Sequence, residues 1–325
     1  MAVKYRPTDY LYISARLRAR DSGLVGKERL ARLLEMKSAE EALDALISEG
    51  VLSSEAKADA ENALTQLWRR ELQTVCSAVP DLALLAFLQY PNDCHNIKTA
   101  LKCHYRGISP NGLWLDAGTV DVAELQGLPA EIPASLPENL KDAVMRACVA
   151  YEQSGDPREI DFILDAACFA DMNESAAPLP IAAELVRIRA DLCNLIICRR
   201  LLAMDAGETA VHTLEHAFLP GGQIGCEQLV AALSQGAEAL DSILQKSEYA
   251  ACFAVDSLQE IEHRADDFYM ERARAAASVP FGAEVAIGYL VGVEYAVKNL
   301  RILLSGKRAQ ATTDTLKGRL RQSYV

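Results

Sequence analysis

Residues 294 to 307 form the sequence Glu-Tyr-Ala-Val-Lys-Asn-Leu-Arg-Ile-Leu-Leu-Ser-Gly-Lys, and this stretch shows the pattern that runs through most of the 325-residue chain. Apolar residues recur at steps of three and four between charged residues, which is the spacing of one face of an α-helix. Alternating β-branched runs bounded by turns, which would indicate strands, are nearly absent. The sequence therefore predicts an all-α fold.

The same stretch places Asn299 inside an apolar helical segment, and two similar segments occur earlier. The three matching tripeptides are Asn96-Ile97-Lys98, Asn194-Leu195-Ile196 and Asn299-Leu300-Arg301, and each is followed within 13 residues by a glycine (Gly107, Gly207 and Gly306). A similar amphipathic segment precedes each asparagine, at residues 41–47, 159–165 and 238–244. Because both elements recur in the same order, we expect three related helical units, at 1–117, 118–217 and 218–325.

Asparagine is a mediocre helix former, so three at matched places indicate a shared role. We expect each amide to hydrogen-bond to a neighbouring helix or back to its own backbone and to fix how its unit packs. Contact with a ligand is the alternative. The copies are not identical, because the middle copy has Ile196 at the basic position and the third has Ala296 where the first two have an aspartate. The residues assigned to this structural motif are Asn96, Lys98, Asn194, Asn299, Arg301 and Gly306.

Turn-forming residues mark the ends of the helical blocks. Residues 109–137 hold four prolines and three glycines and predict a long connection, and shorter breaks are expected at 176–180 and 220–225. Ser38 and Glu41 have the spacing of a capping box, which predicts a helix from about residue 38 that ends by Gly50. Gly288 and Gly292 would let another helix approach closely, inside this chain or across an interface.

Charge is distributed unevenly along the chain. The net charge of −12 argues against a general nucleic-acid binder. Residues 1–37 carry +5 and residues 296–325 carry +6, which leaves −23 on residues 38–295. A solvated surface and an acidic face for a basic protein partner both explain this asymmetry.

Cysteine usage and hydropathy indicate where the protein is found. The nine cysteines show no CxxC pair, which is typical of reduced, buried thiols in a cytoplasmic protein, and residues 1–12 lack the apolar core of a secretory signal. The apolar runs at 82–88 and 285–293 are much shorter than the roughly 20 residues that span a bilayer. We therefore expect no direct membrane insertion, and any membrane association to go through another protein.

Three patterns that are typical of ligand sites lack their usual context. His212-Thr-Leu-Glu-His216 matches the HxxEH pattern of inverted zinc peptidases, but the candidate third ligands Glu260 and Glu262 have no supporting pattern around them. Two Cys and two His within residues 94–104 lack the spacing of a structural zinc site. The Gly-rich stretch 221–225 lacks the Gly-Lys-Ser/Thr ending of a phosphate-binding loop. We therefore expect no catalytic, cofactor-binding or metal-ligating residues.

Several motifs together resemble one known family. They are Tyr-Leu-Tyr-Ile-Ser-Ala-Arg-Leu-Arg-Ala at 10–19, Tyr-Pro-Asn-Asp-Cys-His-Asn-Ile-Lys at 90–98, Pro-Phe-Gly-Ala-Glu at 280–284, the stretch 294–307 and Leu-Arg-Gln-Ser-Tyr-Val at 320–325. With the threefold repeat, they resemble the C subunit of the prokaryotic V/A-type rotary ATPases, known as the d subunit in the eukaryotic vacuolar enzyme. The resemblance covers essentially the whole chain.

The resemblance implies a funnel of three helical units with pseudo-threefold symmetry that catalyses nothing itself. It implies a peripheral central-stalk component on the cytoplasmic face of the membrane, with D/F-type shaft subunits in its opening and the membrane rotor ring on the opposite face. Such a protein passes torque between the ion-translocating ring and the shaft, in ATP synthesis or hydrolysis. The acidic middle of the chain would then line the opening. A helical-repeat scaffold with unrelated partners is the alternative function, and a metallohydrolase is the third.

Overall fold

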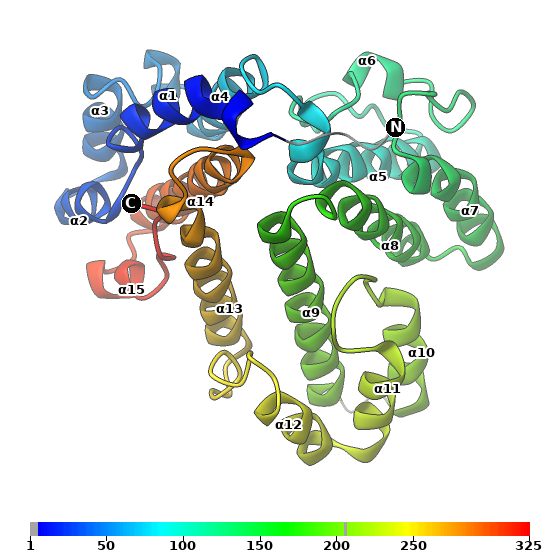
Figure 1. The fold of residues 1–325 in the computed structure, drawn as a ribbon. Coiled ribbons are helices and arrows are strands. Elements are labelled where there is room, and N and C mark those ends of the chain that lie inside the picture. Colours follow the sequence, from blue (N-terminus) through cyan, green and yellow to red (C-terminus); the bar gives the residue numbers. More distant parts are fainter. Residues whose placement is uncertain (1–5, 205–206) are drawn as a thin grey trace. The chain divides into compact units, whose positions relative to one another are not determined.

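The computed structural model describes residues 6–204 and 207–325, and every regular element in these ranges is a helix (Figure 1). The prediction of an all-α fold is confirmed. The α-helices are α1 (Leu11–Asp21), α2 (Lys27–Glu35), α3 (Ala39–Ser48), α4 (Ala60–Cys76), α5 (Tyr90–Arg106), α6 (Val122–Leu125), α7 (Glu138–Ser154), α8 (Pro157–Ala176), α9 (Pro180–Ala203), α10 (Gly207–Ala217), α11 (Cys226–Gln235), α12 (Ala237–Gln245), α13 (Leu258–Ala273), α14 (Ala283–Arg308) and α15 (Thr313–Lys317). The 3₁₀ helices are η1 (Pro7–Tyr10), η2 (Ser54–Lys57), η3 (Leu82–Leu88) and η4 (Arg274–Ser278).

The helices pack into two compact units. Unit 1 consists of the chain up to Leu82 together with Asp266–Val325, and unit 2 consists of Ala83–Ala265. This division follows packing, whereas the three units predicted from the sequence follow a repeated pattern. The three-unit organisation and the funnel therefore stay predictions.

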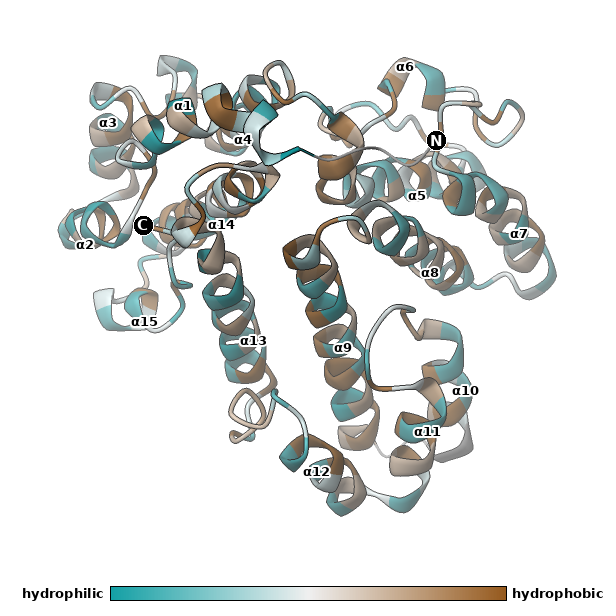
Figure 2. Cartoon of the chain, in the orientation of Figure 1, coloured by the Kyte–Doolittle hydropathy of each residue, from teal (hydrophilic) through white to brown (hydrophobic). Residues whose placement is uncertain are grey.

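Helix α14 forms the centre of unit 1. Its second half buries Ala296, Leu300, Leu303 and Leu304 against the apolar faces of α2, α3 and α4. These four residues lie in the 294–307 stretch, so the apolar spacing of that stretch is the spacing of a buried helix. Hydrophobic residues are frequent along α14 in Figure 2, whereas α13 is mostly hydrophilic. Burying a leucine side chain stabilises a fold by about 2 kcal/mol, so the three leucines of this contact contribute substantially to the stability of unit 1.

Gly288 and Gly292 allow close packing inside unit 1. A Cβ atom on Gly288 would lie 2.5 Å from the Cβ of Ala276 in η4, and one on Gly292 would lie 2.8 Å from the Cβ of Tyr324. The expected helix inside this chain is the 3₁₀ helix η4, which approaches Gly288. The non-helical segment at Tyr324 also packs on both glycines, which the sequence did not predict.

Unit 2 is built on α8, which packs against α5, α7 and α9. Asp171 of α8 also caps the first turn of α7, because its carboxylate accepts hydrogen bonds from the backbone N–H of Asn139 (3.0 Å) and Leu140 (2.8 Å). The residue before α7 is Pro137, which supplies no side-chain cap. Unpaired amides at a helix start need acceptors, and here a neighbouring helix provides one.

The predicted helix boundaries and breaks agree with the structure. Helix α3 runs from Ala39 to Ser48, and Ser38 Oγ accepts from the Glu41 N–H at 3.2 Å. The Glu41 carboxylate accepts from the N–H of Lys37 rather than from Ser38, so only half of the expected capping box forms. Residues 109–137 contain only the short helix α6, and the breaks at 176–180 and 220–225 separate α8 from α9 and α10 from α11.

The three repeated amphipathic segments all lie on helices. Within these segments the buried residues are Ala42, Leu43 and Leu46 in α3, Ile160 and Leu164 in α8, and Leu240 and Leu244 in α12. The second and sixth positions are buried in both α3 and α8, whereas α12 buries the third and seventh positions. The segment in α12 therefore shares the pattern of the other two but not the positions that α8 buries.

None of the helices in the described ranges combines the length and apolar composition that crossing a membrane requires.

Candidate functional site

The three repeated asparagines form the same contact in all three copies. Each is fully buried, and its amide exchanges two hydrogen bonds with the backbone of one residue further along the chain. We call these contacts the asparagine clasps. They join Asn96 to Leu115 (2.8 and 2.8 Å), Asn194 to Leu219 (2.9 and 2.9 Å) and Asn299 to Arg321 (2.9 and 2.7 Å).

An asparagine side chain suits this contact because it carries both a donor and an acceptor. In each clasp Nδ2 donates to the backbone C=O and Oδ1 accepts from the N–H of the same residue. The helices that hold the asparagines are α5, α9 and α14, and the partners lie outside helices, 19, 25 and 22 positions later. Each clasp therefore fixes a non-helical segment onto a long helix. The sequence predicted a neighbouring helix or the asparagine's own backbone as the partner, and the partner is instead the backbone of a non-helical segment further along the chain.

An aspartate three residues before the asparagine extends the first two clasps. Asp93 accepts from the N–H of Thr119 (3.0 Å) and Val120 (3.2 Å) and from the Thr119 hydroxyl (2.7 Å). Its burial raises its pKa, and these hydrogen bonds oppose the rise. A Cβ on Gly118 would lie 2.0 Å from the Asp93 carboxylate, so only glycine fits beside it.

Asp191 is fully buried and holds the second clasp in the same way. It accepts from the Ile224 N–H (3.0 Å) and the Tyr249 hydroxyl (2.8 Å), and a Cβ on Gly222 would lie 2.2 Å from it. Burial and the Asp191 charge both raise the pKa of Tyr249. The third copy has Ala296 in this place, so the aspartate feature is shared by two copies only.

The basic residues of the motif contact different helices. Lys98 donates to Asp165 of α8 at 2.5 Å, and Arg301 pairs with Glu61 of α4. Ile196 supplies no charge in the middle copy. A charged contact common to the three copies is absent, as the sequence indicated.

The three glycines also differ in place. Gly107 ends α5 with a φ of 64°, a left-handed conformation that favours glycine, and Gly207 begins α10. Gly306 lies inside α14, where a Cβ would lie 2.1 Å from a methyl carbon of Leu316. Gly306 therefore lets α15 approach α14, and the glycine part of the repeat does not have one structural role.

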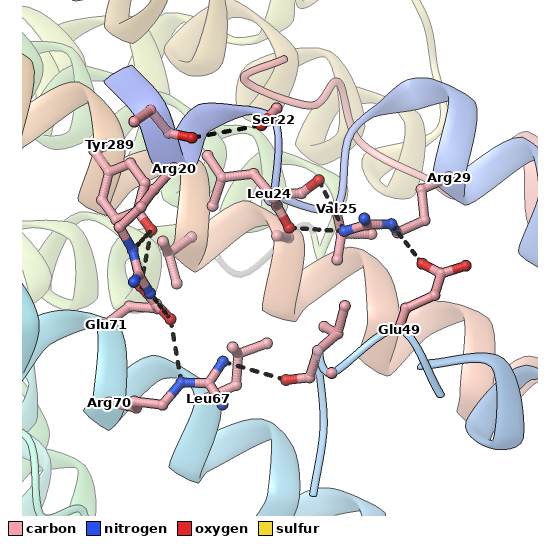
Figure 3. Close-up of a pocket in the computed structure, with 16 residues that line it drawn as sticks. Arg20, Ser22, Leu24, Val25, Arg29, Glu49, Leu67, Arg70, Glu71 and Tyr289 are labelled. Carbon is pink, nitrogen blue, oxygen red and sulfur yellow. Dashed lines mark hydrogen bonds and ion pairs between the residues drawn. The ribbon is translucent and has the colours of Figure 1, made fainter. Parts of the chain in front are cut away.

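A pocket of about 320 Å³ in unit 1 is lined by three arginines and two glutamates (Figure 3). The lining residues belong to helices α1, α2, α4 and α14, to the loop between α1 and α2, and to the segment directly after α3. At one side, the buried Glu71 accepts two hydrogen bonds from Arg20 (2.8 and 2.7 Å), one from Tyr289 (2.8 Å) and one from Arg70 (3.2 Å). At the other side, Glu49 pairs with Arg29 at 2.8 Å. We call this cavity the arginine pocket.

The surroundings keep Glu71 ionised. Burial raises its pKa, but the hydrogen bonds from Tyr289 and Arg20 and the Arg20 charge outweigh burial and hold the pKa below its usual value. Burial and the neighbouring Glu71 raise the pKa of Tyr289 to about 12, so Tyr289 stays protonated and donates. Glu71 was not among the residues expected from the sequence. A signal was present, because Glu71 follows the buried Leu64 and Leu67 at helical spacing and so lies on the apolar face of α4.

We expect the contribution of Glu71 to stability to depend on pH. Its folded pKa lies below its unfolded value near 4.5, so the contribution is complete above pH 4.5 and is lost as the pH falls through the folded pKa. The raised pKa of Asp93 acts in the opposite direction, so the wild-type curve alone does not isolate Glu71. Urea denaturation of the wild type and of Glu71→Gln between pH 7 and pH 3 should show a stability difference that shrinks toward acid. A constant difference would contradict this.

The weak ligand patterns do not gather into a site. His212 and His216 stack with ring centroids 4.1 Å apart, and His216 Nδ1 lies 3.4 Å from Glu159. Cys94 contacts the backbone oxygen of Leu164, whereas the neighbouring His95 contacts a different segment. In residues 6–204 and 207–325 the structure brings together no group of three or more His, Cys, Asp or Glu that could hold a metal ion.

Comparison with known proteins extends over nearly the whole chain. Residues 13–319 match the family model described as ATP synthase (C/AC39) subunit. The C subunit of the V-type sodium ATPase of Enterococcus hirae is 22% identical over 97% of this chain and 99% of its own length. The C subunit of the A-type ATP synthase of Methanocaldococcus jannaschii is 23% identical over 92% of this chain and 82% of its own length, and that of the V-type ATP synthase of Thermus thermophilus is 24% identical over 91% and 93%.

Proposed function

Because the chain belongs to the ATP synthase (C/AC39) subunit family, we propose that it is the non-catalytic central-stalk component of a V/A-type rotary ATPase. In this role it passes torque between the ion-translocating ring in the membrane and the central shaft. The observation that carries the proposal is coverage, since the match to the Enterococcus hirae protein includes 97% of this chain and 99% of that protein. If the two proteins shared only one domain, the alignment would leave a large part of one chain unmatched.

The internal contacts support a mechanical role. An element that transmits torque has to resist deformation, so its non-helical segments must be fixed to its helices. The asparagine clasps do this at three places, each with a fully buried amide. Buried hydrogen bonds of this kind are costly to break, because the freed groups have no water to bind.

The charge distribution supports a basic partner for unit 2. From the sequence, unit 2 carries 12 basic and 26 acidic side chains, a net charge of −14, whereas unit 1 carries 21 basic and 19 acidic side chains. We propose that unit 2 takes part in receiving the D/F-type shaft subunits. The membrane ring is the second proposed partner, and the chain would lie peripherally on the cytoplasmic face.

Neutralising exposed acids of unit 2 should slow shaft binding. At about 10 mM salt, electrostatic attraction extends over about 30 Å. The association rate therefore depends more on the net charge of the unit than on the exact positions of the charged side chains. We expect Glu227→Gln with Glu238→Gln to lower the on-rate for the shaft heterodimer about twofold to threefold and to flatten its salt dependence. Glu28→Gln with Glu35→Gln in unit 1 is the matched control. Stopped-flow binding at several salt concentrations measures both, and equal effects of the two pairs would refute the assignment to unit 2.

The coupling role is tested by what co-purifies with the chain. A tagged chain expressed in its own host and gently solubilised from membranes should bring down catalytic, shaft and ring subunits in fixed ratio, as identified by mass spectrometry. Recovery of the chain without ATPase subunits would reject the coupling role and favour a helical scaffold with other partners.

A further inference from the structure

The arginine pocket has more positive than negative charge. Arg20 and Arg70 both donate to the same Glu71 oxygen, Oε1, at 2.8 and 3.2 Å. Glu49 is likewise shared, by Arg29 (2.8 Å) and Arg32 (3.0 Å). One carboxylate offsets one guanidinium, so the three arginines and two glutamates of the lining leave an unbalanced positive charge.

Two guanidinium groups also keep donors for a ligand. Among the described residues, the hydrogen bonds of Arg20 use its Nε and Nη2 atoms, to Tyr289 and Glu71. The hydrogen bonds of Arg70 use the same two atoms, to Glu71 and to the Val51 carbonyl oxygen. Nη1 of each arginine is therefore available, and both guanidinium groups are held at the pocket by the Glu71 carboxylate, which lies between them (Figure 3).

The lining also includes apolar side chains. Val25, Leu67 and Val293 line the pocket and are almost fully buried, with 3%, 8% and 1% of their surface exposed. A volume of about 320 Å³ lies at the small end of the range for pockets that bind small molecules. A ligand that fits both parts needs an anionic end and a small apolar body.

We propose that the arginine pocket binds a phosphate monoester with a small apolar body. The phosphate oxygens accept from Nη1 of Arg20 and of Arg70, and the apolar body packs on Val25, Leu67 and Val293. A dianionic phosphate matches two guanidinium groups better than a single carboxylate does, because each group can donate to its own oxygen. This inference concerns unit 1 alone and does not rest on the proposed coupling role.

Calorimetric titration of the full chain with phenyl phosphate and with inorganic phosphate tests the site. Phenyl phosphate should bind saturably at one site per chain, about tenfold more tightly than inorganic phosphate, which lacks the apolar body. Equal affinity for the two, or the absence of saturable binding, would overturn the proposal.

The variants Arg70→Met and Arg69→Met separate this site from general charge effects. Arg70→Met removes one phosphate donor and leaves Arg20 and Tyr289 on Glu71, so the fold is retained. Arg69 does not line the pocket, and its replacement makes the same change in net charge. We expect Arg70→Met to weaken phenyl phosphate binding about tenfold and Arg69→Met to change it less than twofold. An equal loss in both variants would assign the binding to overall charge and refute the site.

Discussion

Replacing Asn194 with leucine should lower the free energy of unfolding by about 4 kcal/mol. Leucine has a similar volume but makes no hydrogen bonds, so the N–H and C=O of Leu219 would both lose their partner. Asn194 is fully buried and Leu219 is only 6% exposed, so water does not replace the lost bonds. Each buried, unpaired backbone group costs about 1–3 kcal/mol. Urea denaturation followed by circular dichroism measures the loss.

The control for this substitution is Asn62→Leu. Asn62 is exposed in the first turn of α4, and only its backbone N–H takes part in the cap at Asp59. A change within about 0.5 kcal/mol is expected there, since leucine is a slightly better helix former than asparagine. A loss below about 1 kcal/mol for Asn194→Leu would mean that the clasps do not stabilise the fold. That result would favour the alternative that the asparagines contact a ligand.

The substitution Arg20→Met should cost about 2–3 kcal/mol at pH 7. It removes two of the hydrogen bonds to Glu71 and leaves a carboxylate whose side chain is only 5% exposed. Tyr289 and Arg70 still bind Glu71, which keeps the cost below that of a fully unpaired buried charge. The loss should shrink as the pH falls, because protonation of Glu71 removes the uncompensated charge. Denaturation at pH 7 and near pH 4 measures both effects.

The double variant Arg20→Met with Glu71→Gln tests whether the charge is the cause. Glutamine still accepts the hydrogen bond from Tyr289 but carries no charge, so most of the stability lost in Arg20→Met should return. A double variant as unstable as Arg20→Met would show that the loss comes from packing of the arginine stem instead.

Local sequence patterns predicted those features that depend on neighbouring residues. The helix at Ala39–Ser48, the long connection at 109–137 and the three buried asparagines all follow from spacing and turn residues within a few positions. The capping box at Ser38 was only half correct, because Glu41 binds the N–H of Lys37. That choice depends on how the chain enters the helix, which the spacing of two residues does not define.

The sequence by itself determined that this chain is helical, where four of its helical segments end and that one asparagine recurs on three long helices, because helical periodicity and capping act over a few residues. Only the tertiary structure decided which residues those asparagines hold, since their partners lie 19 to 25 positions away in segments without a periodic pattern. Only the tertiary structure also revealed the arginine pocket, where Tyr289 donates a hydrogen bond to Glu71, which lies 218 positions earlier in the chain. A buried carboxylate selects its partners by packing, and packing brings together residues whose separation along the chain carries no signal.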